Sequence, residues 1–246
     1  MDFLDLEIAK AKDQQTDNWF EERKGRLTSS RYVDMMSMRA PGTKTRRARL
    51  KKQLDKKEIT QKAYNAEISD CVAIENAARF GDGCMTYIYE KVAEILTNSY
   101  HIKTSQATDW GLDYEQEAQD FYEKKTDNQV TQVGFITYGD YAGGSPDGLI
   151  NDDGIIEIKC PFNPANYARV LITKEVPKQD IFQLQGNLMA TDRKYCDFIS
   201  YDPRVVEKSL RMVVIRVRRN EEIIEAIKDR IKEVVEKLHQ IIKEIK

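Results

Sequence analysis

The stretch GGSPDGLINDDGIIEIKCP, from Gly143 to Pro161, constrains the fold of this chain most strongly. It predicts two strands, over 141–150 and 154–160, which the turn-forming sequence NDDG joins into a β-hairpin. Alternate side chains of a strand share a face, so Glu157 and Lys159 point the same way. The apolar residues between and beside them point towards a core. The hairpin therefore carries charged groups inside sequence that is otherwise typical of buried sheet.

Pairing of the two strands can bring the carboxylate of Asp147 close to that of Glu157. Two close carboxylates repel each other unless a proton or a cation lies between them. Oxygen ligands favour hard cations such as magnesium or manganese. Lys159 cannot bind such a metal as a cation, but it can orient a water or offset charge on a phosphate. Alternatively, Asp147 belongs to a Pro-Asp-Gly turn and Glu157 forms an ion pair with Lys159.

The rest of the chain predicts helices before and after a cluster of strands. Helical periodicity and N-cap signals cover 2–23, a segment from Arg31, most of 46–94, 108–126, 180–192 and 221–246. Further strands are predicted over 129–139, 195–202 and 212–218. We expect one α/β domain over 1–246, with a mixed sheet against which helices pack. It divides into a helical part (about 1–107), a core (about 108–218) and a C-terminal helix (about 221–246).

Two segments have regular patterns whose role the sequence leaves open. Apolar residues of the C-terminal helix, from Ile224 to Ile245, follow a heptad spacing. This stripe packs either on its own domain or on another subunit. Between residues 42 and 62 there are nine Lys/Arg against two Asp/Glu. That segment either contacts a polyanion, such as the backbone of duplex DNA, or forms a solvent-exposed helix face.

Composition excludes several classes of protein. The net charge of −2 argues neither for nor against a nucleic-acid partner. No apolar run approaches the roughly 20 residues that span a bilayer, and the acidic N-terminus is not a signal peptide. The four cysteines form no CxxC pair, which argues against a zinc or iron–sulfur site. They are typical of reduced thiols in a cytosolic protein.

Five motifs occur in an order and spacing that resemble one nuclease family. They are WFEERKGRLTSS, WGLDYE, SPDGL with EIKCPF, FQLQGNLM and SYDPR, and they span about 19–204. The chain is similar to the lambda exonuclease family, also called YqaJ-like viral recombinases, within the PD-(D/E)xK nucleases. The resemblance implies a restriction-endonuclease-like α/β core, in which a central mixed sheet is flanked by helices.

The resemblance also implies a metal site. Its ligands would be the carboxylates of Glu115, Asp147 and Glu157 and the backbone carbonyl of Ile158. Lys159 would position the attacking water. The family's equivalents of two glutamines lie on a helix beside the site; Gln183 and Gln185 are either catalytic or ordinary amides of a helix surface.

A second site is implied for the 5′-terminal phosphate of the substrate. Arg23, in the WxxxRxG part of the opening motif, would bind this phosphate together with the hydroxyls of Ser30 and Ser145. A guanidinium presents a planar fork that suits a terminal phosphate. Arg23 as a surface arginine and Ser30 as a helix N-cap remain the alternatives. A phosphate pocket beyond the scissile bond would make the enzyme measure from a DNA end.

The implied function is a Mg²⁺-dependent 5′→3′ exonuclease, with Mn²⁺ as a substitute, acting on double-stranded DNA ends. It would leave 3′ overhangs for phage-type recombination and single-strand annealing. By resemblance it is a ring-shaped homotrimer, encoded by a phage or prophage, that works in the bacterial cytoplasm with an annealing protein and without a membrane. The alternatives are a restriction- or repair-type endonuclease on the same core and a non-catalytic module that binds DNA ends. The presence of all four catalytic residues argues against the latter.

Overall fold

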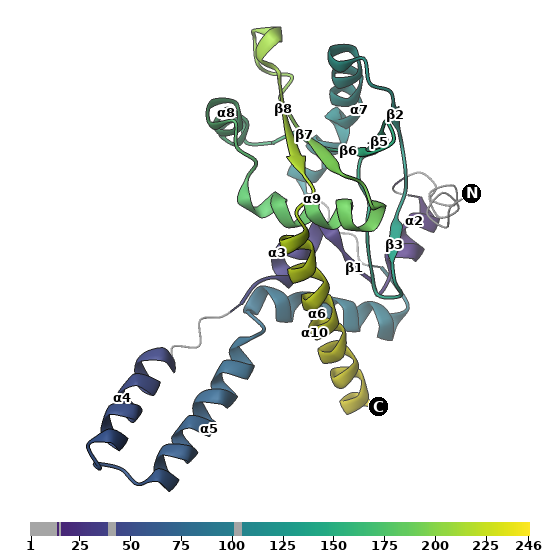
Figure 1. Ribbon diagram of the computed structural model, residues 1–246. Coiled ribbons are helices and arrows are strands. Elements are labelled where there is room, and N and C mark those ends of the chain that lie inside the picture. The colour runs from purple at the N-terminus through teal and green to yellow at the C-terminus, as the bar shows by residue number, and fades with distance from the viewer. Residues whose placement is uncertain (1–13, 15, 39–42, 101–104) are drawn as a thin grey trace.

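The computed structural model describes residues 14, 16–38, 43–100 and 105–246, and its helices enclose two small mixed sheets (Figure 1). Part of the predicted helix over 2–23 and part of the basic segment 42–62 lie outside the described residues. The α-helices are α2 (Asp17–Arg23), α3 (Tyr32–Met35), α4 (Thr43–Asp55), α5 (Gln61–Ala78), α6 (Asp82–Thr97), α7 (Gln106–Thr126), α8 (Pro164–Thr173), α9 (Lys178–Thr191) and α10 (Glu221–Ile245). The strands are β1 (Leu27–Thr28), β2 (Val130–Thr131), β3 (Ile136–Tyr138), β4 (Ala142–Gly144), β5 (Gly148–Ile150), β6 (Gly154–Lys159), β7 (Tyr195–Tyr201) and β8 (Met212–Arg218).

The larger sheet has the strand order β2-β5-β6-β7-β8. Strands β6 and β7 are parallel, and the other neighbours are antiparallel. The predicted hairpin is therefore confirmed as the pair β5–β6, with Asn151 in the left-handed conformation at its turn. The predicted strands over 195–202 and 212–218 correspond to β7 and β8.

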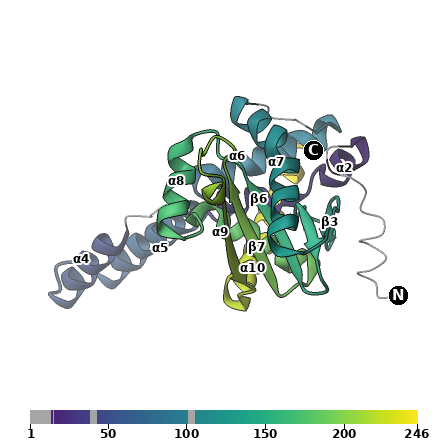
Figure 2. The same ribbon diagram turned by 90° about the horizontal axis from the view of Figure 1, so that it is seen from above.

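Helices cover both faces of this sheet (Figure 2). On one face, Ala118 and Tyr122 of α7 pack on Ile156 and Ile158, which point away from the charged side chains of the same strand. Helices α8 and α9 cover the other face, where Leu184 belongs to the second core cluster. Glu157 and Lys159 alternate with the α7-facing residues, so they lie under α9.

The smaller sheet, β1-β4-β3, joins the N-terminal part of the chain to the core. Its parallel pair β1–β4 places Leu27 beside Ala142 and Thr28 beside Gly143. The sequence predicted an N-cap at LTSS; Thr28 does lie at the N-cap position of a 3₁₀ helix, but its side chain makes no capping hydrogen bond. Leu27–Thr28 is a strand, and the 3₁₀ helix η1 (Ser29–Arg31) leads from it into α3. Ser30 is therefore not a helix N-cap.

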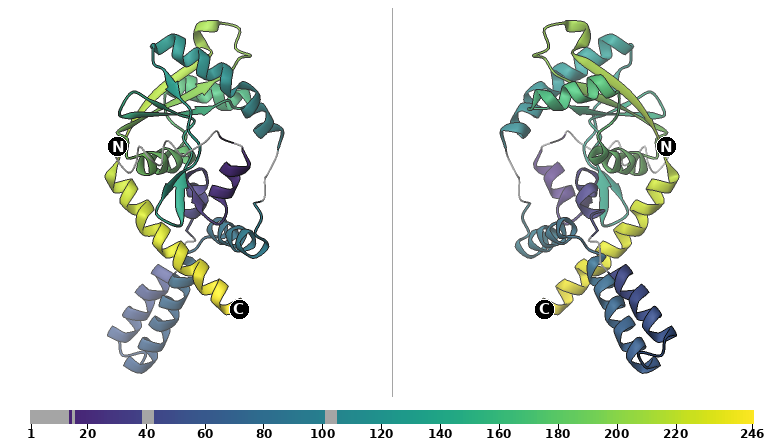
Figure 3. Two further views of the ribbon diagram at one scale, coloured as in Figure 1. Left: turned by 90° about the vertical axis from the view of Figure 1, so that its right-hand side faces the viewer. Right: turned by 90° about the vertical axis from the view of Figure 1, so that its left-hand side faces the viewer.

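The heptad stripe of α10 packs within its own chain. Ile224, Ile227, Val234 and Leu238 are buried in a core cluster shared with α3 and α6. Ile245, at the end of the stripe, is 55% exposed. Figure 3 shows α10 running from the sheet towards the helical part, so the stripe fastens the two halves of the protein together.

Other helix boundaries differ from those predicted. Helix α7 begins at Gln106, because the hydroxyl of Ser105 accepts a hydrogen bond from the Thr108 N–H at 3.2 Å, whereas Asp109 was the predicted cap. Helix α8 was not predicted; Asn163 caps it and Pro164 occupies its first turn. No helix in the described parts of the chain is long and apolar enough to cross a membrane.

A buried arginine of α10 anchors the segments around α3, α5 and α6. Arg230 donates hydrogen bonds to the carbonyls of Met35 at 2.8 Å, Ser37 at 3.2 Å and Arg79 at 2.9 Å. Its guanidinium carbon also lies 4.8 Å from the centre of the Phe80 ring. One side chain thus satisfies three carbonyls at the ends of two segments, α3 and α5.

We predict that Arg230→Ala lowers the free energy of unfolding by about 3 kcal/mol, because it removes the donors of several buried carbonyls. This loss would lower the melting temperature by roughly 6–12 °C in a chain of this size, as measured by calorimetry. The matched change Lys232→Ala, at an exposed position of the same helix, should change it little. Equal effects of the two substitutions would contradict the anchoring role.

Candidate active site

The register of the hairpin brings two predicted metal ligands together. Gly148 of β5 lies opposite Ile156 of β6, and one residue further the same register places Asp147 opposite Glu157. Two hydrogen bonds extend the ladder past the end of β5. The N–H of Asp147 donates to the carbonyl of Ile156 at 3.2 Å, and the N–H of Ile158 donates to Oδ2 of Asp147 at 2.6 Å. The carboxylate of Asp147 is therefore fixed against the backbone of β6.

Glu157 is buried and surrounded by donors. Its Oε1 accepts from Nζ of Lys159 at 2.8 Å and from Nε2 of Gln183 at 2.5 Å. Its Oε2 accepts from Nδ2 of Asn187 at 2.9 Å. The ion pair with Lys159 was the alternative interpretation of the sequence. It is present, but at a carboxylate that is only 1% exposed rather than on a solvated face.

Glu115 joins this group from the other face of the sheet. It lies near the middle of α7 and lines a cavity of about 410 Å³ together with Ile158 and Lys159. Asp180 of α9 and Ser200 of β7 line the same cavity. The hydroxyl of Ser200 is buried and has no hydrogen-bond partner among the described residues. The cavity is thus lined by several polar side chains, one of which, Ser200, lacks a hydrogen-bond partner among the described residues.

The carboxyl groups of Glu115, Asp147 and Glu157 lie close enough that the negative charge of one raises the pKa of another. Burial, and then the charge of Glu115, raise the pKa of Asp147 to about 7. Burial, and then the charge of Asp147, raise the pKa of Glu157 to about 8, outweighing the opposite effect of Lys159. The pKa of Glu115 is raised by burial and by Glu157. Burial alone would lower the pKa of Lys159, but the charges of Glu157 and Asp147 raise it.

This donor set fits a hard divalent cation in its chemistry. The carboxylates raise one another's pKa, and a cation between them would remove that repulsion. Among the described residues, however, no three His, Cys, Asp or Glu side chains form a ready group that could hold a metal ion. Lys159 and Gln183 both donate hydrogen bonds to the same oxygen of Glu157. Any metal here needs further oxygen donors, such as backbone carbonyls or water.

The three residues predicted to bind a terminal phosphate also lie together. The parallel pairing of β1 with β4 brings η1, which follows β1 and contains Ser30, next to the end of β4, which Ser145 follows. Arg23, at the end of α2, donates to the hydroxyl of Ser145 at 3.1 Å and to that of Ser30 at 3.5 Å. A two-residue strand, which the sequence did not predict, therefore builds this group.

Arg23 is held in one orientation and has an unused donor. Its guanidinium carbon lies 4.1 Å from the centre of the Trp19 ring, and Nε1 of Trp19 donates to Ser145 at 3.0 Å. Arg23 is only 7% exposed, and its Nε is a buried atom with no hydrogen-bond partner among the described residues. A buried cation with a free donor beside two hydroxyls fits an anion.

Gln183 and Gln185 have different roles, although they are two residues apart. Gln183 contacts both Glu157 and Lys159, the latter at 3.1 Å. Gln185 is not brought to the carboxylates. Its side chain donates to the carbonyl of Arg218 and accepts from the N–H of Asn220, so it ties α9 to the junction of β8 and α10.

Sequence reasoning missed Asn187. It is fully buried, donates to Glu157, and its Oδ1 accepts from the hydroxyl of Ser29 at 2.5 Å. A Cβ atom on Gly144 would lie 2.4 Å from this Oδ1, so β4 can approach α9 only with glycine there. The spacing of Gln183 and Asn187, one helical turn, was the signal that both amides share a face.

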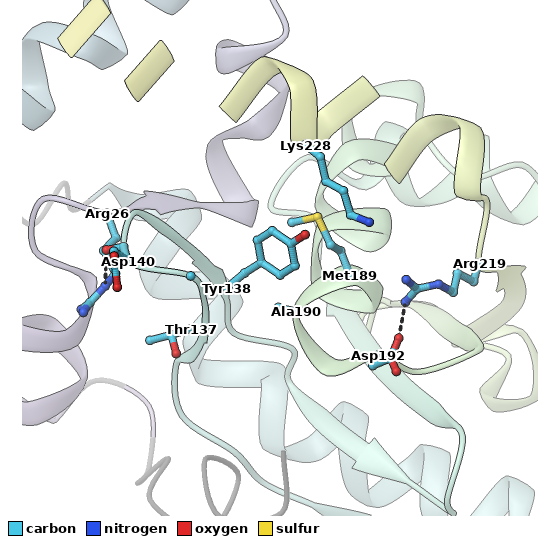
Figure 4. Close-up of a pocket in the computed structure, with 10 residues that line it drawn as sticks. Arg26, Thr137, Tyr138, Asp140, Met189, Ala190, Asp192, Arg219 and Lys228 are labelled. Atoms are coloured by element: carbon cyan, nitrogen blue, oxygen red, sulfur yellow. Dashed lines mark hydrogen bonds and ion pairs between the residues drawn. The ribbon is translucent and has the colours of Figure 1, made fainter. Parts of the chain in front are cut away.

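A larger cavity of about 630 Å³ lies elsewhere (Figure 4). Its two arginines and Lys228 are engaged in ion pairs or with the backbone. Arg219 pairs with Asp192 at 3.5 Å, and Nε of Arg26 donates to the carbonyl of Asp140 at 3.2 Å. Glu115 and Lys159 line the smaller cavity and not this one, so we place the chemistry in the smaller cavity.

Comparisons with known proteins concern the family and the fold of the chain. The family model described as a YqaJ-like viral recombinase domain matches residues 18–194. The chain is also similar to an alkaline exonuclease (LHK-Exo) from Laribacter hongkongensis, at 26% identity and a TM-score of 0.71, over 94% of this chain and 96% of that chain. A structure of LHK-Exo in complex with dAMP matches over the same shares, at 26% identity and a TM-score of 0.72.

A phage-related exonuclease from Haemophilus somnus is 15% identical, with a TM-score of 0.61 over 71% of this chain and 89% of that chain. At that identity the likeness shows the fold alone. None of the curated proteins matches the chain. The similarities confirm the predicted α/β fold, with mixed sheets between helices.

We predict that the metal-free protein loses stability as the pH rises. The folded carboxyls of Asp147 and Glu157 hold protons up to about pH 7 and 8, whereas unfolded carboxyls lose them near pH 4. Between those values the folded state binds more protons, so its stability falls with increasing pH. Even a loss of about 2 kcal/mol would lower the melting temperature in EDTA by roughly 4–8 °C between pH 5 and pH 8.5.

The double variant Asp147→Asn, Glu157→Gln should have a flatter profile of melting temperature against pH. Asp152→Asn, at an exposed position of the hairpin turn, is the control and should follow the wild type. If the double variant and the wild type fall in parallel, the raised carboxyl pKa values do not limit stability.

Proposed function

Because the chain belongs to the YqaJ-like viral recombinase family, we propose that it is a metal-dependent exonuclease that degrades one strand of duplex DNA from the 5′ end. Support comes from the similarity to LHK-Exo over nearly the whole of both chains. That enzyme is an exonuclease, and its complex with dAMP holds a deoxynucleoside monophosphate, the kind of product that an exonuclease releases.

One observation carries the proposed polarity. The anion-binding group of Arg23, Ser30 and Ser145 is joined directly to the carboxylate group, because Ser145 and Asp147 are separated by one residue. Their Cα atoms can be at most about 7 Å apart, even in extended chain. A 5′-terminal phosphate on Arg23 would therefore place the next phosphodiester within reach of Asp147 and Glu157. Such a pocket selects an end and sets where the strand is cut.

Mg²⁺ is the proposed cofactor, and Mn²⁺ its substitute. Asp147, Glu157, Glu115 and the carbonyl of Ile158 would hold it, and when bound it would supply Lewis-acid stabilisation of charge on the phosphate. The side chain of Lys159 has a separate role. Lys159, whose pKa is raised, stays a cation that orients a water and offsets negative charge on the phosphate.

Two amides of α9 position the central carboxylate. Gln183 and Asn187 donate to the two different oxygens of Glu157, so the carboxylate cannot rotate without breaking a hydrogen bond. Asn187 is in turn held by Ser29, which directly precedes Ser30 of the anion-binding group. The phosphate pocket and the catalytic carboxylates are thereby linked through α9 as well as through the chain between Ser145 and Asp147.

The biological setting belongs to the same proposal. The enzyme would leave 3′ single-stranded overhangs for phage-type recombination in the bacterial cytoplasm, together with a single-strand annealing protein. It would act as a homotrimer that surrounds the duplex. Light scattering of the purified protein measures its mass directly, and a monomeric mass at all concentrations would contradict the trimer.

We predict that the wild type with Mg²⁺ degrades linear duplex DNA and leaves a closed circle of the same sequence intact. Asp147→Asn should reduce the rate on linear DNA at least about 100-fold, because it removes a proposed metal ligand. Gel electrophoresis with and without EDTA measures both effects. Rapid cutting of the circle would instead assign a restriction- or repair-type endonuclease, and full activity of Asp147→Asn would exclude catalysis at this site.

We predict that Arg23→Gln reduces the preference for 5′-phosphorylated over 5′-hydroxyl ends by about 10- to 100-fold. This range corresponds to the roughly 1.5–3 kcal/mol typical of a hydrogen bond to a charged group. The matched variant is Arg26→Gln, three residues further along the chain. It should keep the wild-type preference, measured as the ratio of kcat/KM on the two kinds of end. An unchanged preference in Arg23→Gln would place the phosphate pocket elsewhere.

A further inference from the structure

The helical hairpin of α4 and α5 takes no part in either site. It projects from the body of the protein in Figures 1 and 3. Helix α5 has 18 residues and is thus about 27 Å long. The only large apolar residue that α4 buries completely is Leu50, so this hairpin, which we call the arm, contributes little to the core.

Hydrogen bonds join the two sides of the root of the arm, which are Ser37 before α4 and Arg79 to Gly81 after α5. The N–H of Gly81, where the chain returns from α5, donates to the carbonyl of Ser37 at 3.1 Å. The guanidinium of Arg230 bridges the carbonyls of Ser37 and Arg79, on the two sides of the root. Arg79 also forms an ion pair with Glu233 of α10. The two ends of the arm are therefore fastened to each other and to α10.

Two arginines of α4 form ion pairs with acidic residues of α5, inside the arm. Arg46 pairs with Glu67 at 2.5 Å and with Asp70 at 3.6 Å, and Arg47 pairs with Glu75 at 2.6 Å. These arginines lie on the side of α4 that faces α5, which also carries Leu50. The pairs join the two helices to each other and involve one side of α4.

The opposite side carries four exposed cations: Lys44, Arg49, Lys51 and Lys52. At 3.6 residues per turn they lie away from the row that faces α5. None of them forms an ion pair with a described residue. Asp55 is the one acid of α4, at its C-terminal end, and Lys56 and Lys57 follow it in the turn. A face made only to be solvated usually mixes both signs.

The arm projects on the side of the protein where the active-site cavity is lined by α8. Figures 1 and 2 both place the arm and α8 on the same side of the body. Asn166 and the exposed Arg169 of α8 line that cavity. In Figure 1 α8 lies at the top of this side and the arm at the bottom, so a duplex that leaves the cavity along this side would reach the arm.

We propose that the outward face of α4 binds the phosphate backbone of the duplex behind the end that is being degraded. The proposal rests on the proposed function for its substrate, but it concerns a surface far from the chemistry. Charge complementarity carries it: a broad face of cations that form no ion pair with a described residue matches a polyanion, and each neutralised phosphate releases counterions. A two-fold contact with another copy of the chain is a poorer match, because the same cations would face and repel each other.

The test compares two variants with the same net charge. The arm variant is Lys44→Gln, Arg49→Gln, Lys51→Gln, Lys52→Gln. The control variant neutralises four exposed lysines elsewhere: Lys208→Gln, Lys232→Gln, Lys243→Gln, Lys246→Gln. Binding to a 5′-phosphorylated duplex of about 40 base pairs, roughly four helical turns, is measured by fluorescence anisotropy in EDTA across a salt series. EDTA prevents cleavage during the measurement.

The arm variant should bind at least about tenfold more weakly at moderate salt. The slope of log K against log salt should become shallower by about 3–4, because each phosphate that the protein no longer neutralises reduces it by about 0.9. The control variant should keep the wild-type slope. With Mg²⁺, KM of the arm variant should rise more on the duplex of about 40 base pairs than on one of about 10, which spans only about 34 Å.

A wild-type slope in the arm variant would overturn the proposal. If that variant instead has a changed mass in light scattering, the arm is a contact between subunits. Should the fourfold variant not fold, as judged by circular dichroism, Lys51→Gln and Lys52→Gln singly should each reduce the slope by about 0.9. A wild type that binds with a steep slope but digests no DNA would contradict the proposed nuclease and leave the arm contact supported.

Discussion

Repulsion between buried carboxylates is the constraint on which the rest of the site depends. The β5–β6 register places Asp147 opposite Glu157, and Glu115 approaches from α7. Burial and mutual repulsion raise the pKa of all three. Lys159 and the amides of α9 reduce this cost without removing it. The protein keeps an arrangement that is unfavourable by itself and whose repulsion a cation would remove, as expected for a site built for function rather than for stability.

The second organising feature is the junction between the two sheets. Strand β4 ends at Gly144 and β5 begins at Gly148, so the three intervening residues leave the small sheet and enter the large one. They include Ser145, which belongs to the anion-binding group, and Asp147, which belongs to the carboxylate group. The parallel partner β1 brings the N-terminal Arg23 to this junction. Residues more than a hundred positions apart thus meet where two sheets are connected.

The sequence predicted the core well, because strands β6, β7 and β8 have strong alternating or apolar patterns of adequate length. It failed where short elements depend on tertiary contacts. Strand β1 has two residues and exists only through β4, so no local pattern could show it. Asn187 was missed because a buried amide has no signature apart from its partner. Gln183 and Gln185 looked equivalent, yet only the helix geometry decides which one faces Glu157. The direction of the arm follows from Arg230, which lies about 150 residues beyond its root.

The root of the arm has an evolutionary consequence. Because Ser37 and Gly81 are hydrogen-bonded to each other, the chain leaves the body and returns to it at one point. Such a segment can be shortened, lengthened or replaced without rerouting the main chain, since loop closure at the root is already satisfied. The arm is therefore an exchangeable module. Relatives of this chain can differ in it entirely while they retain the same sheets and carboxylates.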